Sequence, residues 1–324
     1  MREISFSEAT LEAMTEEMLR DDRVFVLGED IARQGGIFGQ FKGLPQAVGA
    51  DRVLDTPISE TAIVGSGVGA AMAGMRPVID MHFADFVGVA MDEVLNQMAK
   101  VRYMFGGQCT VPLVLRAPDG LVNSAAAQHS QSLEAWFLHI PGIRVVVPSN
   151  PADAKGLLKA AIRSDDPVIY FEHKRLFAMK GPVPDGEHLV PLGKAAVARP
   201  GKDVTLISYS LTMHKVLEAA AELAEYGIDA ECIDLRSIVP LDTETIFAAV
   251  KKTKRLVIAH ESVKQGGVGA EIAALVAEEL LDYLDAPIKR LGAPFVPIPF
   301  SPALESLVRI EPRDIVAAAK DVCR

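Results

Sequence analysis

Short apolar runs alternate with longer amphipathic segments along most of the chain. The runs have the length and continuous hydrophobicity of strands that are buried on both faces of a parallel sheet. We expect strands over residues 24–27, 77–81, 111–115, 143–147, 167–171, 204–209, 230–235, 255–260 and 288–291. We expect helices over residues 91–103, 213–226, 242–252 and 268–284. This alternation predicts an α/β fold with a doubly wound, mainly parallel sheet in each half.

Further helices carry start signals in the sequence. Ser5 and Glu8 have the spacing of a capping box, ahead of apolar residues at helical spacing. Asn150 precedes Pro151, which is the order of an N-cap and a first helical position. We therefore expect one helix to follow Ser5 and another to begin at Pro151.

The domain boundary is expected where hydrophobic periodicity fades. Residues 180–191 are rich in glycine and proline and show little hydrophobic pattern, and the alternation restarts beyond them. The 324 residues leave room for two domains of roughly 150 residues. We place the domains at residues 1–185 and 186–324, and we read residues 35–49 as a loop that covers another part of the fold.

Composition narrows the classes of partner. A net charge of -10 argues against a nucleic-acid or anionic membrane surface, because both attract basic patches. The apolar run 62–75 is too short to span a bilayer, and we expect no targeting segment. Cys109, Cys232 and Cys323 lack the spacing of a disulfide framework or a zinc site, and the histidines show no metal spacing. We expect a cytoplasmic protein.

One stretch, residues 54–74, stands out chemically. It carries the carboxylate Glu60 at the head of a segment of small and apolar residues. Each glycine in a helix costs about 1 kcal/mol against alanine, so the lack of bulk indicates a close neighbour. Glu60 is explained either by the helix dipole, which favours acids in a first turn, or by a catalytic role.

Two familiar motifs can be tested on the same stretch. Residues 65–70 fit the loose Gly-x-Gly-x-x-Ala fingerprint of a dinucleotide site, but residues 58–61 make a poor preceding strand. Ser66 fails as a hydrolase nucleophile because Val64 stands where Gly-x-Ser-x-Gly requires glycine. A nicotinamide-dependent oxidoreductase therefore stays open as an alternative.

Four further residues are candidates when taken together. Glu29 follows a predicted strand, at the end where open α/β sheets bind ligands, although many such acids only cap turns. Taken singly, His82 and His129 are better explained as satisfied core or surface histidines than as catalytic groups, and Phe86 is explained as core. The combination, rather than any single residue, indicates a site.

Besides the small-residue helix, four motifs follow one another along the chain: Asp55-Thr56-Pro57-Ile58-Ser59-Glu60, His82-Phe83-Ala84-Asp85-Phe86, Ala126-Ala127-Gln128-His129-Ser130-Gln131 and Asp153-Ala154-Lys155-Gly156-Leu157-Leu158. Asp234-Leu235-Arg236 lies in the second domain. Together these motifs resemble the β subunits of thiamine-diphosphate-dependent 2-oxo acid dehydrogenases, a group that includes the pyruvate, branched-chain and acetoin enzymes. The resemblance runs the whole length.

The resemblance implies a thiamine pyrimidine-binding domain followed by a transketolase-like C-terminal domain. It also implies that Glu60 bonds to the pyrimidine ring and makes the imino tautomer accessible. Burial among Ile58, Ile63 and Val64 would let this carboxyl group share a proton at neutral pH. Phe86 would stack on the pyrimidine, with Glu29, Ile58 and His82 lining its pocket. His129 would face the reacting end of the coenzyme.

The resemblance also implies partners, because the chain has no Gly-Asp-Gly, the motif with which thiamine enzymes hold the metal and diphosphate. An α subunit would supply Mg²⁺ and the diphosphate site in an α2β2 heterotetramer, and a lipoyl acyltransferase core would dock on the second domain. A structural potassium ion would bind backbone oxygens of Leu113, Ala161, Ser164 and Asp166.

The substrate is left open between related compounds. Residues 102–107 and 172–174 are more similar to acetoin-cleaving members, whereas residues 129–135 are also similar to the branched-chain type. We expect acetoin first and pyruvate second. A non-catalytic scaffold subunit is a further alternative, in which the polar residues are structural.

Overall fold

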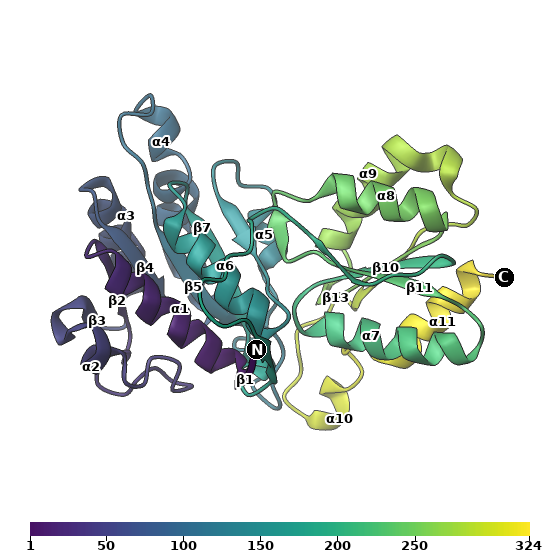
Figure 1. The fold of residues 1–324 in the computed structure, drawn as a ribbon, viewed down its shortest axis with the longest axis horizontal. Coiled ribbons are helices and arrows are strands. Elements are labelled where there is room, and N and C mark those ends of the chain that lie inside the picture. Colours follow the sequence, from purple (N-terminus) through teal and green to yellow (C-terminus); the bar gives the residue numbers. More distant parts are fainter. The chain divides into compact units, whose positions relative to one another are not determined.

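The computed structural model describes residues 1–324, which form two compact units (Figure 1). The first unit contains Met1–Asp119 and Trp136–Leu192, and the second contains Gly120–Ala135 and Gly193–Arg324. The units thus divide after residue 192, seven positions beyond the boundary placed from the sequence. Nothing in the hydrophobic pattern indicates that residues 120–135 join the second unit.

The first unit contains a parallel sheet with the strand order β6-β7-β5-β4-β2-β3. Its strands are β2 (Val24–Gly28), β3 (Val53–Asp55), β4 (Arg76–Asp80), β5 (Val114–Asp119), β6 (Arg144–Val146) and β7 (Val168–His173). The predicted strands are confirmed except for their ends. A separate antiparallel pair joins β1 (Arg2–Ser5) to β8 (Lys180–Val183). Strand β8 lies within residues 180–191, where the sequence analysis places the domain boundary.

The helices of this half confirm both start signals. Ser5 and Glu8 form the capping box, and the Asn150 side chain accepts a hydrogen bond from the Asp153 amide. The helices are α1 (Phe6–Arg20), α2 (Leu44–Val48), α3 (Glu60–Met72), α4 (Val101–Met104) and α6 (Pro151–Arg163). A short helix, α5 (Glu134–Phe137), begins in the second unit and ends in the first. Short 3₁₀ helices are η1 (Ala50–Arg52), η2 (Ala84–Ala90) and η4 (Lys174–Leu176).

The prediction of a continuous α-helix over residues 91–103 is wrong. The segment forms a π-helix, η3 (Glu93–Met98), and then the short helix α4. The Ala99 amide donates to the Val94 carbonyl at 3.1 Å, five residues back, which is the wider π spacing. Apolar spacing over so short a segment does not distinguish the two kinds of turn.

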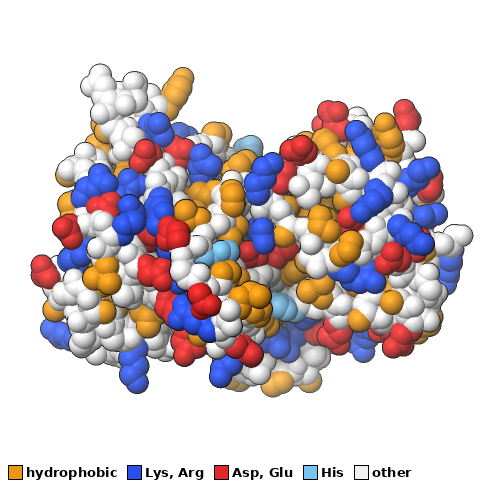
Figure 2. All heavy atoms as spheres, viewed as in Figure 1, with side chains coloured by type: hydrophobic (Ala, Val, Ile, Leu, Met, Phe, Trp, Pro, Cys, Tyr) orange, Lys and Arg blue, Asp and Glu red, His pale blue; other side chains and the backbone are white.

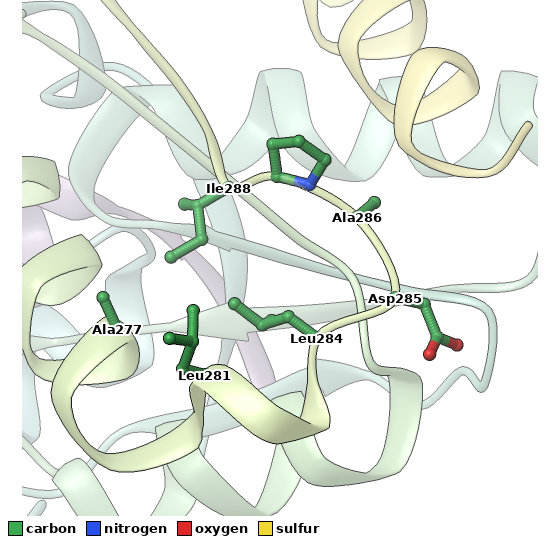
Figure 3. A pocket seen from close by; sticks show the side chains of 7 residues that line it. Ala277, Leu281, Leu284, Asp285, Ala286 and Ile288 are labelled. Atoms are coloured by element: carbon green, nitrogen blue, oxygen red, sulfur yellow. The ribbon is translucent and has the colours of Figure 1, made fainter.

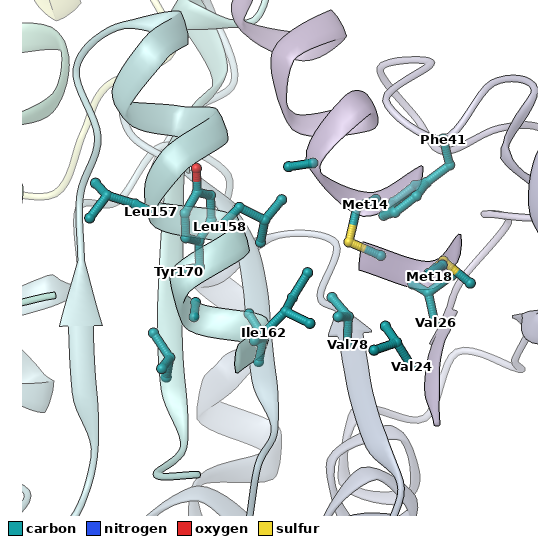
Figure 4. Close-up of a cluster of buried hydrophobic side chains, with 14 of the residues drawn as sticks. Met14, Met18, Val24, Val26, Phe41, Val78, Leu157, Leu158, Ile162 and Tyr170 are labelled. Carbon is teal, nitrogen blue, oxygen red and sulfur yellow. The ribbon is translucent and has the colours of Figure 1, made fainter. Parts of the chain in front are cut away.

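Alternate residues of the central strands pack against helices on opposite faces of this sheet. On one face, Val78 joins a buried cluster with residues of α1 and α6, such as Met14 and Ile162 (Figure 4). On the other face, Ile79 packs against α3. A Cβ atom at Gly67 of α3 would lie only 2.9 Å from Ile79 Cγ2, so the small residue permits the close approach that the sequence indicates.

The second unit contains the sheet order β14-β13-β10-β11-β9, in which only β9 is antiparallel. The strands of this sheet are β9 (Ala196–Arg199), β10 (Val204–Ser208), β11 (Ala230–Asp234), β13 (Leu256–Val263) and β14 (Lys289–Ala293). A further short strand of the unit, β12 (Ser237–Val239), is not part of it. Its helices are α7 (Ser210–Glu225), α8 (Thr243–Thr253), α9 (Val268–Leu280), η5 (Leu281–Tyr283), α10 (Pro302–Glu305) and α11 (Pro312–Val322).

Helices cover both faces of this sheet as well. Apolar residues of α7 and α11 form one buried cluster with β10, β11 and β13. Thr253 of α8 bonds to Thr205 of β10 at 2.6 Å, and Gly269 of α9 lies against Ile258 of β13. Two doubly wound α/β units are therefore present, as the alternation of strands and helices predicts.

Charged side chains are mixed over the surface. Figure 2 shows acidic and basic groups interspersed on the face that it draws. Of the helices, none combines the length and hydrophobicity needed to cross a lipid bilayer.

Candidate active site

The carboxyl ends of β2 and β4 bring two predicted site residues to one edge of the first sheet. Glu29 directly follows β2, and His82 comes two residues after β4. The strands lie side by side with Gly28 opposite Asp80. A Cβ atom at Gly28 would lie 2.8 Å from the Asp80 carbonyl oxygen, so glycine lets these strand ends approach each other.

Glu29 faces the charge of Glu60 at this edge. Glu60 is the first residue of α3, and its side chain is half-buried. Burial raises the pKa of Glu29, the Glu60 carboxylate raises it further, and His82 lowers it. The Oε1 atom of Glu29 is buried and makes no hydrogen bond within the chain. A ligand with a hydrogen-bond donor would satisfy this oxygen.

The expected burial of Glu60 is only partly correct. Ile63 and Val64 are buried behind it in α3, but Ile58 is 81% exposed. Ile58 lies in the irregular segment between β3 and α3, at the surface of this chain. Glu60 itself is half-buried, so its burial within this chain is incomplete.

His82 is held by a carboxylate that sequence reasoning missed. Its Nε2 atom forms an ion pair with Asp80, whose side chain has no exposed area. The buried amide of Gln40 lies 3.3 Å from the same nitrogen. Burial lowers the pKa of His82, but the negative charges of Asp80 and Glu29 outweigh burial and raise it. The pKa of His82 is therefore raised at this edge, mainly by the charge of Asp80.

A second ion pair lies deeper in the sheet. The guanidinium of Arg116 on β5 bonds to Glu172 on β7 through two nitrogens, and it donates to the Thr10 hydroxyl at 2.9 Å. Both charged side chains are completely buried. Their sequence signal is available but weak, since it consists of lone charges within apolar strand runs.

Aromatic side chains stand beside His82. Phe86 is half-buried in η2, and its ring centre lies 6.3 Å from that of Phe83. A cis peptide bond joins His82 to Phe83. The Phe83 ring also receives the ammonium group of Lys174, at 4.9 Å from the ring centre. This segment thus offers both flat apolar surface and charge.

The remaining catalytic candidate, His129, belongs to the second unit. It is half-buried in the irregular segment that precedes α5. The structure therefore gathers Glu29, Glu60 and His82 in one unit and assigns His129 to the other.

Comparison with known proteins gives the family. A model for the transketolase pyrimidine binding domain matches residues 2–180, and a model for the transketolase C-terminal domain matches residues 193–315. The 2-oxoisovalerate dehydrogenase subunit beta of Bacillus subtilis (strain 168) is 46% identical over 324 residues, covering 99% of each chain. The chain belongs to the β subunits of thiamine-diphosphate-dependent 2-oxo acid and acetoin dehydrogenases.

Other relatives of this β subunit carry different substrate names. The acetoin:2,6-dichlorophenolindophenol oxidoreductase subunit beta of Bacillus subtilis (strain 168) is 48% identical, covering 99% of this chain and 97% of the relative. The pyruvate dehydrogenase E1 component subunit beta of Rhizobium meliloti (strain 1021) is 46% identical, covering 100% and 70%. A solved split-gene transketolase, described as an inactive beta4 tetramer, shares the fold with a TM-score of 0.79 at 24% identity, covering 99% and 98%.

The dinucleotide fingerprint does not survive in this β subunit. Residues 65–70 lie inside α3, which begins at Glu60, whereas the fingerprint requires the glycines to follow a strand directly. Of these glycines, Gly67 packs closely against Ile79 of the sheet, whereas Gly69 is exposed.

The potassium candidates lie around the end of α6 and the start of β7. The carbonyl oxygens of Leu113 and Ala161 each accept one backbone hydrogen bond. The Ser164 carbonyl accepts from Arg76 at 2.6 Å, and the Asp166 carbonyl accepts from the Ser164 hydroxyl at 2.9 Å. A carbonyl oxygen has two lone pairs, so each of these oxygens can accept one further interaction.

Two surface pockets of the second unit contain none of the predicted site residues. One, of about 460 Å³, is mainly apolar and is lined by residues of α9, η5 and the following turn, including Leu281 and Ile288 (Figure 3). The other, of about 640 Å³, includes Lys264, Arg290 and Phe295. No group of three or more histidine, cysteine or acidic side chains is arranged to hold a metal.

Proposed function

We propose that this β subunit, with an α subunit, forms a thiamine-diphosphate-dependent enzyme that cleaves acetoin or a 2-oxo acid and passes the acyl group to lipoamide. The observation that carries the proposal is the meeting of Glu60, Glu29 and the Asp80–His82 pair at one sheet edge. Residues 1–185 are the proposed pyrimidine-binding domain, and residues 186–324 the transketolase-like C-terminal domain.

The residues present suit the pyrimidine end of the coenzyme. Thiamine diphosphate, when bound, would supply a nucleophilic thiazolium carbon and an aminopyrimidine group that can accept a proton. The unpaired oxygen of Glu29 fits a donor on a heterocycle, and Phe86 offers a stacking surface. Ile58, exposed in this chain, would cover the edge of the ring.

Glu60 is the proposed acid–base residue. Its half-buried carboxyl group can hold or release a proton at a ring nitrogen, beside Glu29 and His82, whose pKa values are both raised. His129 is proposed to move protons, or to guide the incoming lipoyl group, at the reacting end. These are separate tasks, one at each end of the coenzyme.

The partners follow from what this chain does not carry. An α subunit would supply Mg²⁺ and the diphosphate site, in an α2β2 assembly, and a lipoyl acyltransferase core would bind the second domain. The exposed small-residue face of α3, with Ser66 and Gly69, supports close contact with another chain. We keep the cytoplasm as the proposed location and potassium as a proposed structural ion.

Acetoin is the first proposed substrate, and pyruvate the second. The relatives named for acetoin, pyruvate and 2-oxoisovalerate are 46–48% identical, which does not separate these substrates. Assaying the assembled enzyme on all three, with 2,6-dichlorophenolindophenol as electron acceptor, decides between them.

The Glu60→Gln variant tests the function. In the assembled enzyme we expect turnover to fall by about 10²–10⁴-fold with assembly intact, because an amide cannot exchange the proton. Glu3→Gln, at an exposed site, is the matched control. Near-normal turnover of Glu60→Gln would remove Glu60 from this role. Full activity of a Glu60→Ala and His129→Ala double variant would favour a scaffold subunit.

A further inference from the structure

The loop that carries His129 has little regular structure of its own. Residues 120–133 contain no helix or strand, and Ser124 and Ala126 have positive φ angles of 54° and 59°. Residues with side chains adopt such angles only when the surroundings hold them there. The position of His129 therefore depends on contacts that the loop makes with the rest of its unit.

Glu261, near the end of β13, holds both ends of this loop. Its Oε1 atom accepts a hydrogen bond from the Leu121 amide at 2.6 Å and another from the Ser132 hydroxyl at 3.3 Å. The Gly120 amide also donates to the Gln131 carbonyl at 3.1 Å, which brings the two ends together. One carboxylate thus closes a loop in which His129 lies between its two attachment points.

A second carboxylate holds the middle of the loop. Glu305 is buried, and its Oε2 atom accepts from the Ser124 amide at 2.7 Å. Arg309 pairs with Glu305 and also donates to the Asn123 side chain at 2.8 Å. The positive-φ residue Ser124 is therefore held by a charge-assisted bond, which is stronger than a bond between neutral groups.

A third contact anchors the start of the following helix. The buried carboxyl group of Glu134 accepts from the Tyr209 hydroxyl. All of these anchoring groups belong to the second unit, as does the loop itself. Three acidic side chains, Glu261, Glu305 and Glu134, thus hold this irregular segment and the helix start that follows it.

We propose that Glu261 is a positioning residue for His129. Glu261 closes the 120–133 loop from both ends, and the Glu305–Arg309 pair assists it by holding the middle of the loop. This proposal rests on the proposed role of His129. Because both attachment points share one oxygen atom, losing Glu261 frees both ends of the loop together.

The test compares Glu261→Ala and Glu261→Gln in the enzyme assembled with its α subunit. Glutamine keeps an acceptor oxygen, so it should restore most of what alanine loses. For Glu261→Ala we expect amide hydrogen exchange over residues 120–134 to quicken at least about tenfold. We expect kcat to fall by about 10–100-fold, the effect of misplacing a catalytic group. Glu278→Ala, exposed on α9, should change neither.

A double variant separates positioning from general destabilisation. If Glu261 acts through His129, adding Glu261→Ala to His129→Ala should lower kcat no further than His129→Ala alone. If the two substitutions lower kcat by the product of their separate effects, the proposal is wrong. Unchanged amide hydrogen exchange over residues 120–134 in Glu261→Ala would also overturn it. If His129→Ala keeps full turnover, the proposed role of His129 fails, and the exchange result still reports on the loop.

A milder variant covers the case in which Glu261→Ala does not assemble. Ser132→Ala removes one of the two attachments and leaves Glu261 in place. Faster exchange over residues 130–134 with a smaller fall in kcat supports the proposal. Unchanged exchange there contradicts it.

Discussion

The two units each bury a histidine near the carboxyl end of a central strand, and the two histidines have opposite charge preferences. His82 follows β4 and pairs with Asp80, so its pKa is raised. His260 lies within β13 and has no exposed area. Burial lowers the pKa of His260 to about 4, and its bond to Ser262 opposes this only in part.

The difference teaches that the partner, rather than burial, decides the charge of a buried imidazole. Asp80 supplies a full negative charge, whereas Ser262 supplies a carbonyl oxygen at 3.1 Å and a hydroxyl. The Nε2 atom of His260 is surrounded by the glycines at the start of α9 and makes no hydrogen bond. The first unit therefore presents a charged sheet edge, and His260 remains a neutral core residue.

The largest effect is expected from breaking the buried charges of the first unit. Arg116→Met leaves Glu172 buried without its counter-charge, which should lower the free energy of unfolding by about 3–5 kcal/mol. Denaturant unfolding of the purified chain measures it. Combining Arg116→Met with Glu172→Leu should recover most of the loss.

A surface pair of the second unit is the matched control. Lys289 and Asp321 lie 2.6 Å apart but are both about half exposed, so Lys289→Met should cost far less stability than Arg116→Met. Equal losses for Arg116→Met and Lys289→Met would refute the contrast between the buried and exposed pairs.

His260 should make the second unit sensitive to acid. Its folded pKa of about 4 lies below the usual value of about 6.5, so the unfolded chain binds more protons between these pH values. The unit should lose about 3 kcal/mol of stability as the pH falls from about 6.5 to about 4. Hydrogen exchange of β13 amides measures this, and His260→Gln should flatten the dependence.

His82 should respond in the opposite direction. Because its folded pKa is raised, the stability from the Asp80–His82 pair is complete below about pH 6.5 and is lost as the pH rises through the folded pKa. Following the imidazole resonances of His82 and His260 by NMR compares the two sites directly. The assignment of charge fails if His260 keeps its proton to a higher pH than His82.

A small effect is expected from potassium. If backbone oxygens of Leu113, Ala161, Ser164 and Asp166 bind the ion, potassium at ten times its dissociation constant should stabilise the first unit by about 1.4 kcal/mol. Melting curves in potassium and sodium chloride at equal ionic strength measure this. Identical curves in the two salts would argue against the site.

The elements that the sequence predicts well are those with strong local patterns. The apolar runs of β2, β10 and β11 and the capping box before α1 are short-range features, and the structure confirms them. The β1–β8 pair was missed because a four-residue strand at the surface, far from its partner in sequence, leaves no periodic signal.

Residues of the candidate site divide in the same way. Glu60 is recognisable because a lone acid heads a run of small residues, and its place at the start of α3 follows from local pattern. Asp80 and Arg116 look like isolated charges in apolar strands, and their roles depend on neighbours that are distant in the chain.

By itself, the sequence determined the α/β class, the positions of most helices and strands, and the family motifs that contain Glu60, His82 and His129. Hydrophobic periodicity and helix capping involve residues that are close together in the chain, so both can be recognised from the sequence alone. Only the tertiary structure decided that Asp80 raises the pKa of His82, that burial lowers the pKa of His260, and that Glu261 holds the loop of His129. These outcomes arise from burial and contacts between distant segments, which local pattern does not encode.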